Sequence, residues 1–195
     1  EKELQAVEKF NGMFAFALWD SKRNRLWSCR DRLGIKPVVY YWDGKNFAFA
    51  SEIKALIVDD SIPKELDYEA LQLFLTFNYV PAPYTIFKGI RKLERGHYLV
   101  LEDGKIEITK YWDAPAVNDQ AIASLPIAEQ EAFYKDQLFR ELEKAVRRRM
   151  VADVPLGAFL SGGVDSSIIV ALMARNTEMP VQTFSIGYNN EGLYD

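Results

Sequence analysis

The feature that most constrains the fold of this chain is a glycine- and serine-rich turn between an apolar segment and a helix-like segment. The turn occupies residues 161–167, with the sequence SGGVDSS, after the apolar residues 155–160 and before the helical pattern of residues 168–175. Glycines let backbone N–H groups crowd around phosphate oxygens, and a helix start adds unpaired donors and a positive dipole end. The sequence therefore predicts a strand, a phosphate-binding loop and a helix in direct succession.

The side chains of this loop suit a nucleotide bound through its phosphates. Ser161, Ser166 and Ser167 offer hydroxyl donors, and Asp165 offers a carboxylate that can hold Mg²⁺ against the phosphates. No Gly-Lys-Ser/Thr follows the glycines, so the loop is not a Walker A sequence and γ-phosphate transfer is not predicted. The alternative without a ligand is a helix N-cap at Ser161 or Asp165 beside a flexible glycine turn.

Residues 159–167 resemble the pyrophosphate loop of the ATP-pyrophosphatase, or adenine nucleotide α-hydrolase-like, family. The preceding residues 150–157 narrow the resemblance to glutamine-hydrolysing asparagine synthetases. Such enzymes cleave ATP between its α- and β-phosphates and adenylate a substrate. The resemblance implies ATP and Mg²⁺ as cofactors and Asp165 as a metal ligand. It implies nucleotide or pyrophosphate binding by nine residues: Leu160, Ser161, Gly162, Gly163, Asp165, Ser166, Ser167, Ile186 and Gly187.

A second resemblance covers the first part of the chain. Residues 11–20, 30–37 and 50–56 are similar to the class II glutamine amidotransferase domain, which has the N-terminal-nucleophile αββα fold and releases ammonia from glutamine. The catalytic residue of that family is an N-terminal cysteine, whereas this chain begins with Glu1. No catalytic residue is therefore assigned within the chain, and we expect an internal fragment that is inactive by itself.

Three other sites are predicted to be structural. Cys29 lies inside an expected strand with no histidine close in sequence to activate it, so we expect a small buried apolar residue. Residues 30–32 are expected to form an ion-pair network at the end of that strand, with a direct catalytic contribution as the alternative. His97, the one histidine of the chain, is expected to make a structural hydrogen bond.

The predicted fold class is α/β, with an N-terminal part that is α+β. We expect a partial N-terminal-nucleophile αββα sandwich followed by the start of a parallel-sheet adenine nucleotide α-hydrolase-like domain. Residues 1–60 would be the C-terminal part of the glutaminase domain, and residues 61–125 an interdomain connection with a helix and a β-hairpin. Residues 126–195 would then be the N-terminal part of the ATP-pyrophosphatase domain.

Periodicity and turn residues predict the elements. Strands are expected at residues 13–19 (covered on both faces), 26–30, 38–42, 47–50, 96–101, 106–112, 154–160 and 180–187. Helices are expected from Ser51 as a cap to Leu56, from Asp67 as a cap to Phe77, over 129–150 with a core-facing stripe, and over 166–175. In the second helix Leu71, Phe74 and Leu75 are expected to point inward.

The composition limits the partners. A net charge of −4, with 27% charged residues, leaves no basic surplus for nucleic acid or an anionic membrane. The apolar runs are too short to span a bilayer. With one cysteine and no signal-peptide pattern, the chain is expected in the cytoplasm. The expected partners are small molecules, namely glutamine, aspartate and ATP, and a homodimer is compatible with them.

The predicted function is glutamine-dependent, ATP-driven amidation of aspartate to asparagine through β-aspartyl-AMP, with release of AMP and pyrophosphate. The first alternative is a related amidotransferase or lactam-forming synthetase with another carboxylate acceptor. The second is a non-catalytic scaffold or nucleotide sensor with a degenerate glutaminase fold. A glutamine-independent pyrophosphatase, such as an NAD or argininosuccinate synthetase, would leave the pattern of residues 11–56 without a purpose.

Overall fold

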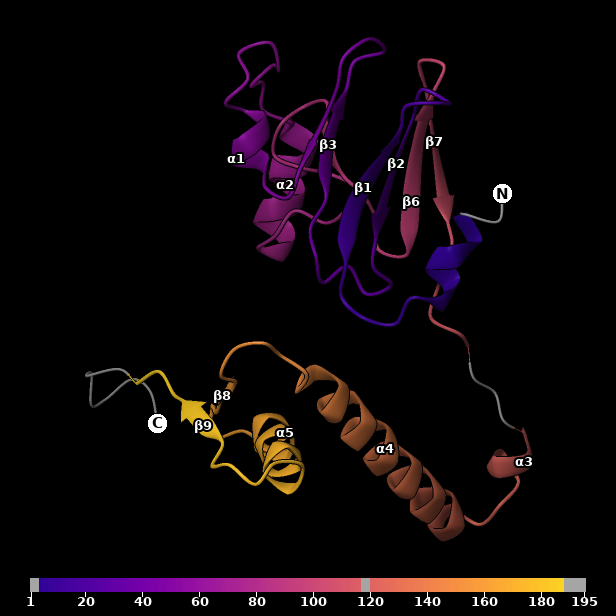
Figure 1. The fold of residues 1–195 in the computed structure, drawn as a ribbon, viewed down its shortest axis with the longest axis vertical. Coiled ribbons are helices and arrows are strands. Elements are labelled where there is room, and N and C mark those ends of the chain that lie inside the picture. Colours follow the sequence, from indigo (N-terminus) through magenta and orange to yellow (C-terminus); the bar gives the residue numbers. More distant parts are fainter. Residues whose placement is uncertain (1–3, 117–119, 188–195) are drawn as a thin grey trace. The chain divides into compact units, whose positions relative to one another are not determined.

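The computed structural model of the chain describes residues 4–116 and 120–187, and it divides into two compact units. The first unit is Glu1–Ala116 and the second is Val117–Asp195. Each has hydrophobic side chains packed into its own core. Figure 1 shows the helices and strands of both units. The expected division at residues 60 and 125 remains a prediction.

The first unit contains a four-stranded antiparallel sheet that follows the short 3₁₀ helix η1 (Leu4–Lys9). Its strand order is β1 (Ala15–Asp20), β2 (Arg25–Arg30), β6 (His97–Glu102) and β7 (Lys105–Lys110). Phe16 faces Cys29 across the first pair, and Trp27 faces Val100 across the second. The two predicted hairpins are therefore confirmed, and they join into one sheet because β2 pairs with β6.

A second antiparallel sheet has the order β4 (Phe47–Ala50), β3 (Val39–Trp42) and β5 (Ile90–Lys92). Helices α1 (Ile53–Leu56) and α2 (Tyr68–Phe77) lie beside it, on the side away from β1, β2, β6 and β7 (Figure 1). Val38, Leu93 and Leu99 form one buried cluster. Val39, Tyr41, Leu56, Ile62 and Ile90 form another. The mixed α/β class with antiparallel sheets is thus confirmed for this unit.

The ends of the two helices follow local sequence signals only in part. The side chain of Asp67 accepts a hydrogen bond from the Ala70 amide at 3.1 Å, so the predicted N-cap of α2 is confirmed. The prediction that Ser51 caps α1 is wrong, because Glu52 is the N-cap residue and makes no side-chain capping bond. The inward placement of Leu75 is also wrong, since its side chain is 73% exposed.

Strand β1 is not covered on both faces as predicted. It lies at the end of the strand order, and Trp19 is 56% exposed with Leu18 beside it. Within the described residues no layer packs over these two side chains. The apolar character of β1 is therefore not matched by burial there.

The second unit contains α3 (Gln120–Ala123), α4 (Ile127–Arg149), β8 (Gly157–Phe159), α5 (Val164–Arg175) and β9 (Gln182–Phe184). Strands β8 and β9 pair in parallel, with Ala158 opposite Thr183, so the predicted strand–helix–strand unit is present. Val146, Leu172 and Met173 form its buried cluster. A larger nucleotide-hydrolase-like sheet stays a prediction.

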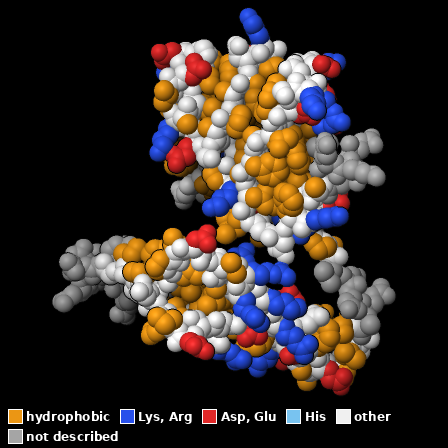
Figure 2. Space-filling view, viewed as in Figure 1, with side chains coloured by type: hydrophobic (Ala, Val, Ile, Leu, Met, Phe, Trp, Pro, Cys, Tyr) orange, Lys and Arg blue, Asp and Glu red, His pale blue; other side chains and the backbone are white. Residues whose placement is uncertain are grey.

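Helix α4 faces a core only near its C-terminal end. Val146 is buried, but Leu138 is 61% exposed, so the expected core-facing stripe along the whole helix is wrong. Lys and Arg side chains gather along α4 in Figure 2. Ion pairs one turn apart, such as Lys144 with Glu141 at 2.7 Å, are typical of a solvated helix face. Among the described residues, no helix is long and apolar enough to cross a membrane.

Candidate functional site

The glycine- and serine-rich loop lies where the parallel strands β8 and β9 end. The Leu160 amide donates to the Phe184 carbonyl oxygen at 2.9 Å, which continues the pairing one residue beyond β8. The Ser185 hydroxyl donates back to the Leu160 carbonyl oxygen at 2.5 Å. The carboxyl ends of parallel strands are the usual place for ligands in such sheets. Ile186 and Gly187, which the sequence also singled out, follow directly at this edge.

The backbone of the loop needs glycine at its turn. Gly162 has φ of +83°, a left-handed conformation that L-residues rarely adopt, and open space surrounds the position that a Cβ would take. Gly163 is extended, with φ −75° and ψ 161°, and is the N-cap residue of α5. The alternative in which Ser161 or Asp165 caps the helix is therefore wrong. The absence of side chains at two successive positions leaves this end of α5 open.

Hydroxyl groups of the loop bond to one another and to the backbone. Ser166 and Ser167 donate to the Gly163 carbonyl oxygen at 3.1 and 2.8 Å. The Ser161 and Ser166 oxygens lie 3.1 Å apart, and the Ser161 amide lies 3.3 Å from the Ser166 oxygen. Because the Ser166 proton is used toward Gly163, Ser161 is the donor between the two hydroxyls. These hydrogen bonds join residue 161 to the first turn of α5 and fix the backbone of the loop between them.

The donors that remain for an anion are mainly backbone amides. The amides of Val164, Asp165 and Ser166 occupy the first turn of α5, where a helix provides no acceptor. The Gly163 amide has only a long 3.5 Å contact to the Ser161 oxygen. The loop is exposed, so a ligand has access to these groups. The arrangement can hold a phosphate group by amide hydrogen bonds and by the positive end of the helix dipole.

Asp165 stands in the first turn of α5 with an exposed side chain. In the part of the chain that the structure describes, its carboxylate has no hydrogen-bond or ion-pair partner. No cluster of three metal-ligating side chains occurs among the described residues. Mg²⁺ commonly takes one or two protein carboxylates together with substrate phosphate oxygens. A single free carboxylate beside a phosphate cradle fits that ligand set.

Two features were not predicted from the sequence: the contact of Ser185 with Leu160 and the packing of the Phe184 ring against Gly157. A Cβ on Gly157 would lie 2.5 Å from the Phe184 ring, so the glycine lets that ring pack over β8. The Phe184 ring also meets Phe159 edge to face, with centroids 6.5 Å apart. The available signal for Ser185 was its position near the carboxyl end of the predicted parallel strand of residues 180–187, of which only Gln182–Phe184 forms β9. Both features position the two strand ends relative to the loop.

The side chains of Arg30 and Asp31 in the first unit hydrogen-bond to backbone groups of nearby segments. The guanidinium of Arg30 donates to the carbonyl oxygens of Leu93 and Gly34 at 2.6 and 2.7 Å. Asp31 is 1% exposed, and its carboxylate accepts the amides at positions 33, 35 and 36 at 3.1, 3.0 and 2.8 Å. The predicted ion-pair network is therefore replaced by charged groups bound to backbone. Burial lowers the pKa of Arg30.

Cys29 and His97 have structural surroundings, as expected. Cys29 is fully buried in β2, and burial raises the pKa of its thiol to about 12. Burial likewise raises the pKa of Tyr111, whose hydroxyl donates to the Arg30 carbonyl oxygen at 2.8 Å. The Nδ1 atom of His97 lies 2.7 Å from the Arg95 carbonyl oxygen. None of these contacts activates the thiol as a nucleophile.

Comparison with known families agrees with the two units. Residues 2–112 match the glutamine amidotransferase domain family, and residues 137–195 match the asparagine synthase family. A Methanocaldococcus jannaschii protein, provisionally named glutamine-hydrolysing asparagine synthetase 2, is 40% identical over 194 residues, covering 97% of this chain and 36% of its own length. Glutamine-hydrolysing asparagine synthetase 3 of Bacillus subtilis is 36% identical over 199 residues, covering 100% and 31%.

A relative with a different name also matches. The amidase chry2 of Gibberella zeae is 31% identical over 177 residues, covering 88% of this chain and 25% of its own length. The chain thus spans about a third or less of these curated relatives. The matches cross both units, so the amidotransferase part and the loop-bearing part occur together in each relative.

Proposed function

Because the chain belongs to the asparagine synthetase family of glutamine-hydrolysing amidotransferases, we propose that its whole protein converts aspartate to asparagine with ATP and glutamine. The observation that carries this proposal is the open amide cradle at the start of α5, placed at the carboxyl ends of β8 and β9. ATP binds with its phosphates over residues 161–167 and its adenine near Leu160 and Ile186. The family relationship supports the pairing of this site with a glutaminase.

The proposed reaction has two halves. An aspartate side-chain carboxylate attacks the α-phosphorus of ATP, the bond to the β-phosphate oxygen breaks, and β-aspartyl-AMP and pyrophosphate form. Ammonia from glutamine then displaces AMP and gives asparagine. The amides of residues 163–166 stabilise the negative charge that develops on the leaving pyrophosphate. They are fixed before ATP arrives by the serine hydroxyls that close the loop.

A bound Mg²⁺ would supply charge neutralisation for the phosphates, with Asp165 as its protein ligand. The role of Asp165 is then to fix the position of the metal at the mouth of the loop. Ser161, Ser166 and Ser167 keep Gly162 and Gly163 in the conformation that exposes the amides. Ser185 ties the end of β9 to Leu160, which keeps the second strand end at the same edge.

The test uses the protein at its full natural length with Mg²⁺-ATP and glutamine, with and without aspartate. AMP, pyrophosphate, glutamate and asparagine are measured together. We expect AMP, pyrophosphate and asparagine to appear only when aspartate is present. Asp165→Ala, or replacement of Gly163 by a bulky residue, should abolish adenylation and leave glutamate formation largely intact. Full asparagine synthesis by Asp165→Ala would refute the assigned role of that carboxylate.

A second candidate is an amidotransferase with another carboxylate acceptor, since one relative that matches both units has a name other than asparagine synthetase. The loop and the glutaminase part would act as above, and only the acceptor would differ. The same assay distinguishes the two: glutamate formation without aspartate-dependent AMP release indicates another acceptor. Absence of every product would favour the scaffold alternative and contradict both proposals.

A further inference from the structure

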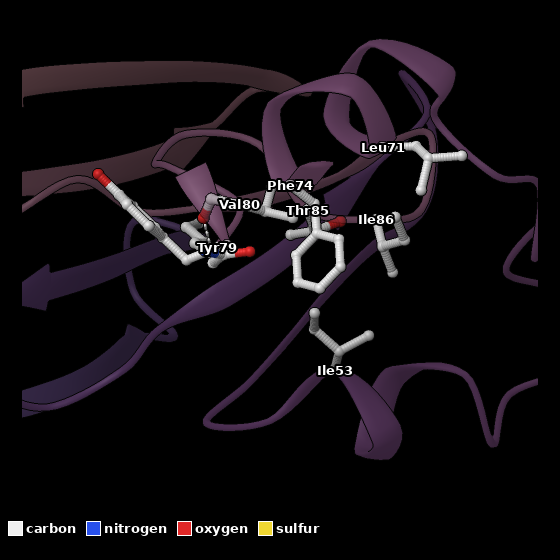
Figure 3. Close-up of a pocket in the computed structure, with 9 residues that line it drawn as sticks. Ile53, Leu71, Phe74, Tyr79, Val80, Thr85 and Ile86 are labelled. Carbon is white, nitrogen blue, oxygen red and sulfur yellow. Dashed lines mark hydrogen bonds between the residues drawn. The ribbon is translucent and has the colours of Figure 1, made fainter. Parts of the chain in front are cut away.

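An apolar pocket of about 540 Å³ lies in the first unit, far along the chain from the loop of residues 161–167. Its walls come from α1, α2 and the segment that follows α2, and they include Ile53, Leu71, Val80 and Ile86. Figure 3 shows the Phe74 ring near the middle of the pocket, with Ile53 across from it. A volume of this size suits a small organic molecule.

Lys92 brings a positive charge to this apolar surface. It is the last residue of β5, and its ammonium donates to the Val80 carbonyl oxygen while its amide donates to the Pro83 carbonyl oxygen at 2.8 Å. Throughout the described residues, no carboxylate pairs with Lys92. Burial lowers the pKa of its ammonium, and the nearby Arg30 charge acts in the same direction. One bond to a carbonyl leaves two of the three ammonium protons for other acceptors.

The other polar groups of the pocket differ in what they can offer. The buried Thr85 hydroxyl lies 2.9 Å from the Ile90 carbonyl oxygen and accepts the Phe87 amide at 3.2 Å, so it is occupied. Asn78 is the C-cap residue that follows α2, and its side-chain amide has no partner in the part of the chain that the structure describes. Among the described residues that line the pocket, the side-chain groups with unused hydrogen-bonding capacity are therefore the Lys92 ammonium, the Asn78 carboxamide and the Tyr79 hydroxyl. Each of them can donate to an anionic oxygen.

We propose that this pocket binds a small monocarboxylate with an apolar body. Its carboxylate would accept hydrogen bonds from Lys92 and Asn78, and its hydrocarbon part would contact Phe74, Ile53 and Ile86. A half-buried cation without a counter-ion gains most from a single anionic group. The apolar walls select against small inorganic anions, which have no surface to bury there. This inference does not depend on the proposed synthetase reaction.

The test uses the protein at its full natural length, with isoleucine methyl groups labelled for NMR. The probe is 4-phenylbutyrate, and the control ligand is 4-phenylbutyramide, which has the same body and no charge. We expect 4-phenylbutyrate to shift the Ile53 and Ile86 methyl signals in a saturable way. The amide should bind at least about tenfold more weakly, because it loses the charge-assisted hydrogen bond.

Two variants separate charge from packing. Lys92→Met keeps much of the side-chain length and should weaken the carboxylate at least about tenfold while changing amide binding little. Leu75→Ala alters an exposed residue of α2 that does not line the pocket, and it should leave both affinities unchanged. The acid-against-amide comparison needs no variant, so misfolding cannot obscure it. Equal affinity for acid and amide, or no saturable shift at 10 mM probe (roughly a 3 kcal/mol limit), would overturn the proposal.

Discussion

Replacing the buried carboxylate of Asp31 should destabilise the first unit in a graded way. The carboxylate accepts three backbone amides, two on Oδ1 and the amide of Lys36 on Oδ2. In Asp31→Asn one oxygen remains for two of these amides, while the new NH₂ group faces the amide of Lys36. One charge-assisted bond is lost and two donors confront each other, which costs about 2–3 kcal/mol. Asp31→Ala leaves all three amides without an acceptor and should cost about 5 kcal/mol.

Urea unfolding, monitored by tryptophan fluorescence, measures the free energy of unfolding of each variant. The chain has four tryptophans, at positions 19, 27, 42 and 112, and all lie in the first unit. Hydrogen exchange of the segment 32–37 gives a local measurement of the same loss. The matched control is Asp60→Asn, because the Asp60 side chain is 97% exposed and pairs with Lys64 at 3.0 Å. That change should cost less than about 1 kcal/mol.

The order of the variants is the critical outcome. We expect the free energy of unfolding to fall in the order control, Asp31→Asn, Asp31→Ala. If Asp31→Asn lies within about 0.5 kcal/mol of the control, the three amide bonds do not stabilise the loop after β2. The structural role assigned to Asp31 would then be refuted, and the catalytic alternative for residues 30–32 would regain its weight.

Three further predictions concern single contacts. Gly157→Ala should destabilise the β8–β9 pair by about 1–3 kcal/mol because the new Cβ lies 2.5 Å from the Phe184 ring, and Phe184→Leu should restore part of that loss in a double-mutant cycle by thermal unfolding. The Asn46 amide, with neighbouring amides, lowers the pKa of Asp43 to about 2 from 3.8. The contribution of the Asp43 carboxylate to stability is therefore complete above about pH 4 and is lost as the pH falls toward 2. An NMR titration of the β3–β4 turn should record this change, and the change should be absent in Asp43→Asn. Cys29 should resist iodoacetamide at pH 8 in the native protein and react in denaturant, as read by peptide mass spectrometry; rapid native labelling would contradict its burial.

Local signals predicted the elements whose cause lies within a few residues. An aspartate followed by an apolar helical pattern placed the N-cap of α2 at Asp67, and it is there. Turn residues between alternating apolar segments predicted both hairpins of the first sheet. The glycine pair before a helical pattern predicted the open start of α5. In each case one short segment contains both the signal and the group that satisfies it.

The features that were missed depend on distant partners. Strand β5 has three residues, too few for a period, and forms because β3 lies beside it. Leu75 is exposed whereas Ala70 of the same helix is buried, and helical spacing alone does not determine which side of α2 is buried. The contacts of Arg30 with Leu93 cross 63 positions of sequence. The three successive charged residues 30–32 suggested ion pairs. In the structure, Arg30 and Asp31 instead hydrogen-bond to backbone carbonyl and amide groups.

The loop at the start of α5 has a consequence for ligand choice. Residues 160–167 include no lysine or arginine, and their one charged side chain is the carboxylate of Asp165. A polyanion bound there would contact oriented amides but no positively charged side chain of residues 160–167. Its negative charge would therefore have to be compensated by a cation that binds together with it. If the loop binds a nucleotide as proposed, we expect it to favour a metal-complexed nucleotide over free inorganic phosphate, with the metal contributing part of that selectivity. Its amides and hydroxyls do not titrate near neutrality, so we expect any pH dependence of phosphate binding in that range to come from the second ionisation of the phosphate itself.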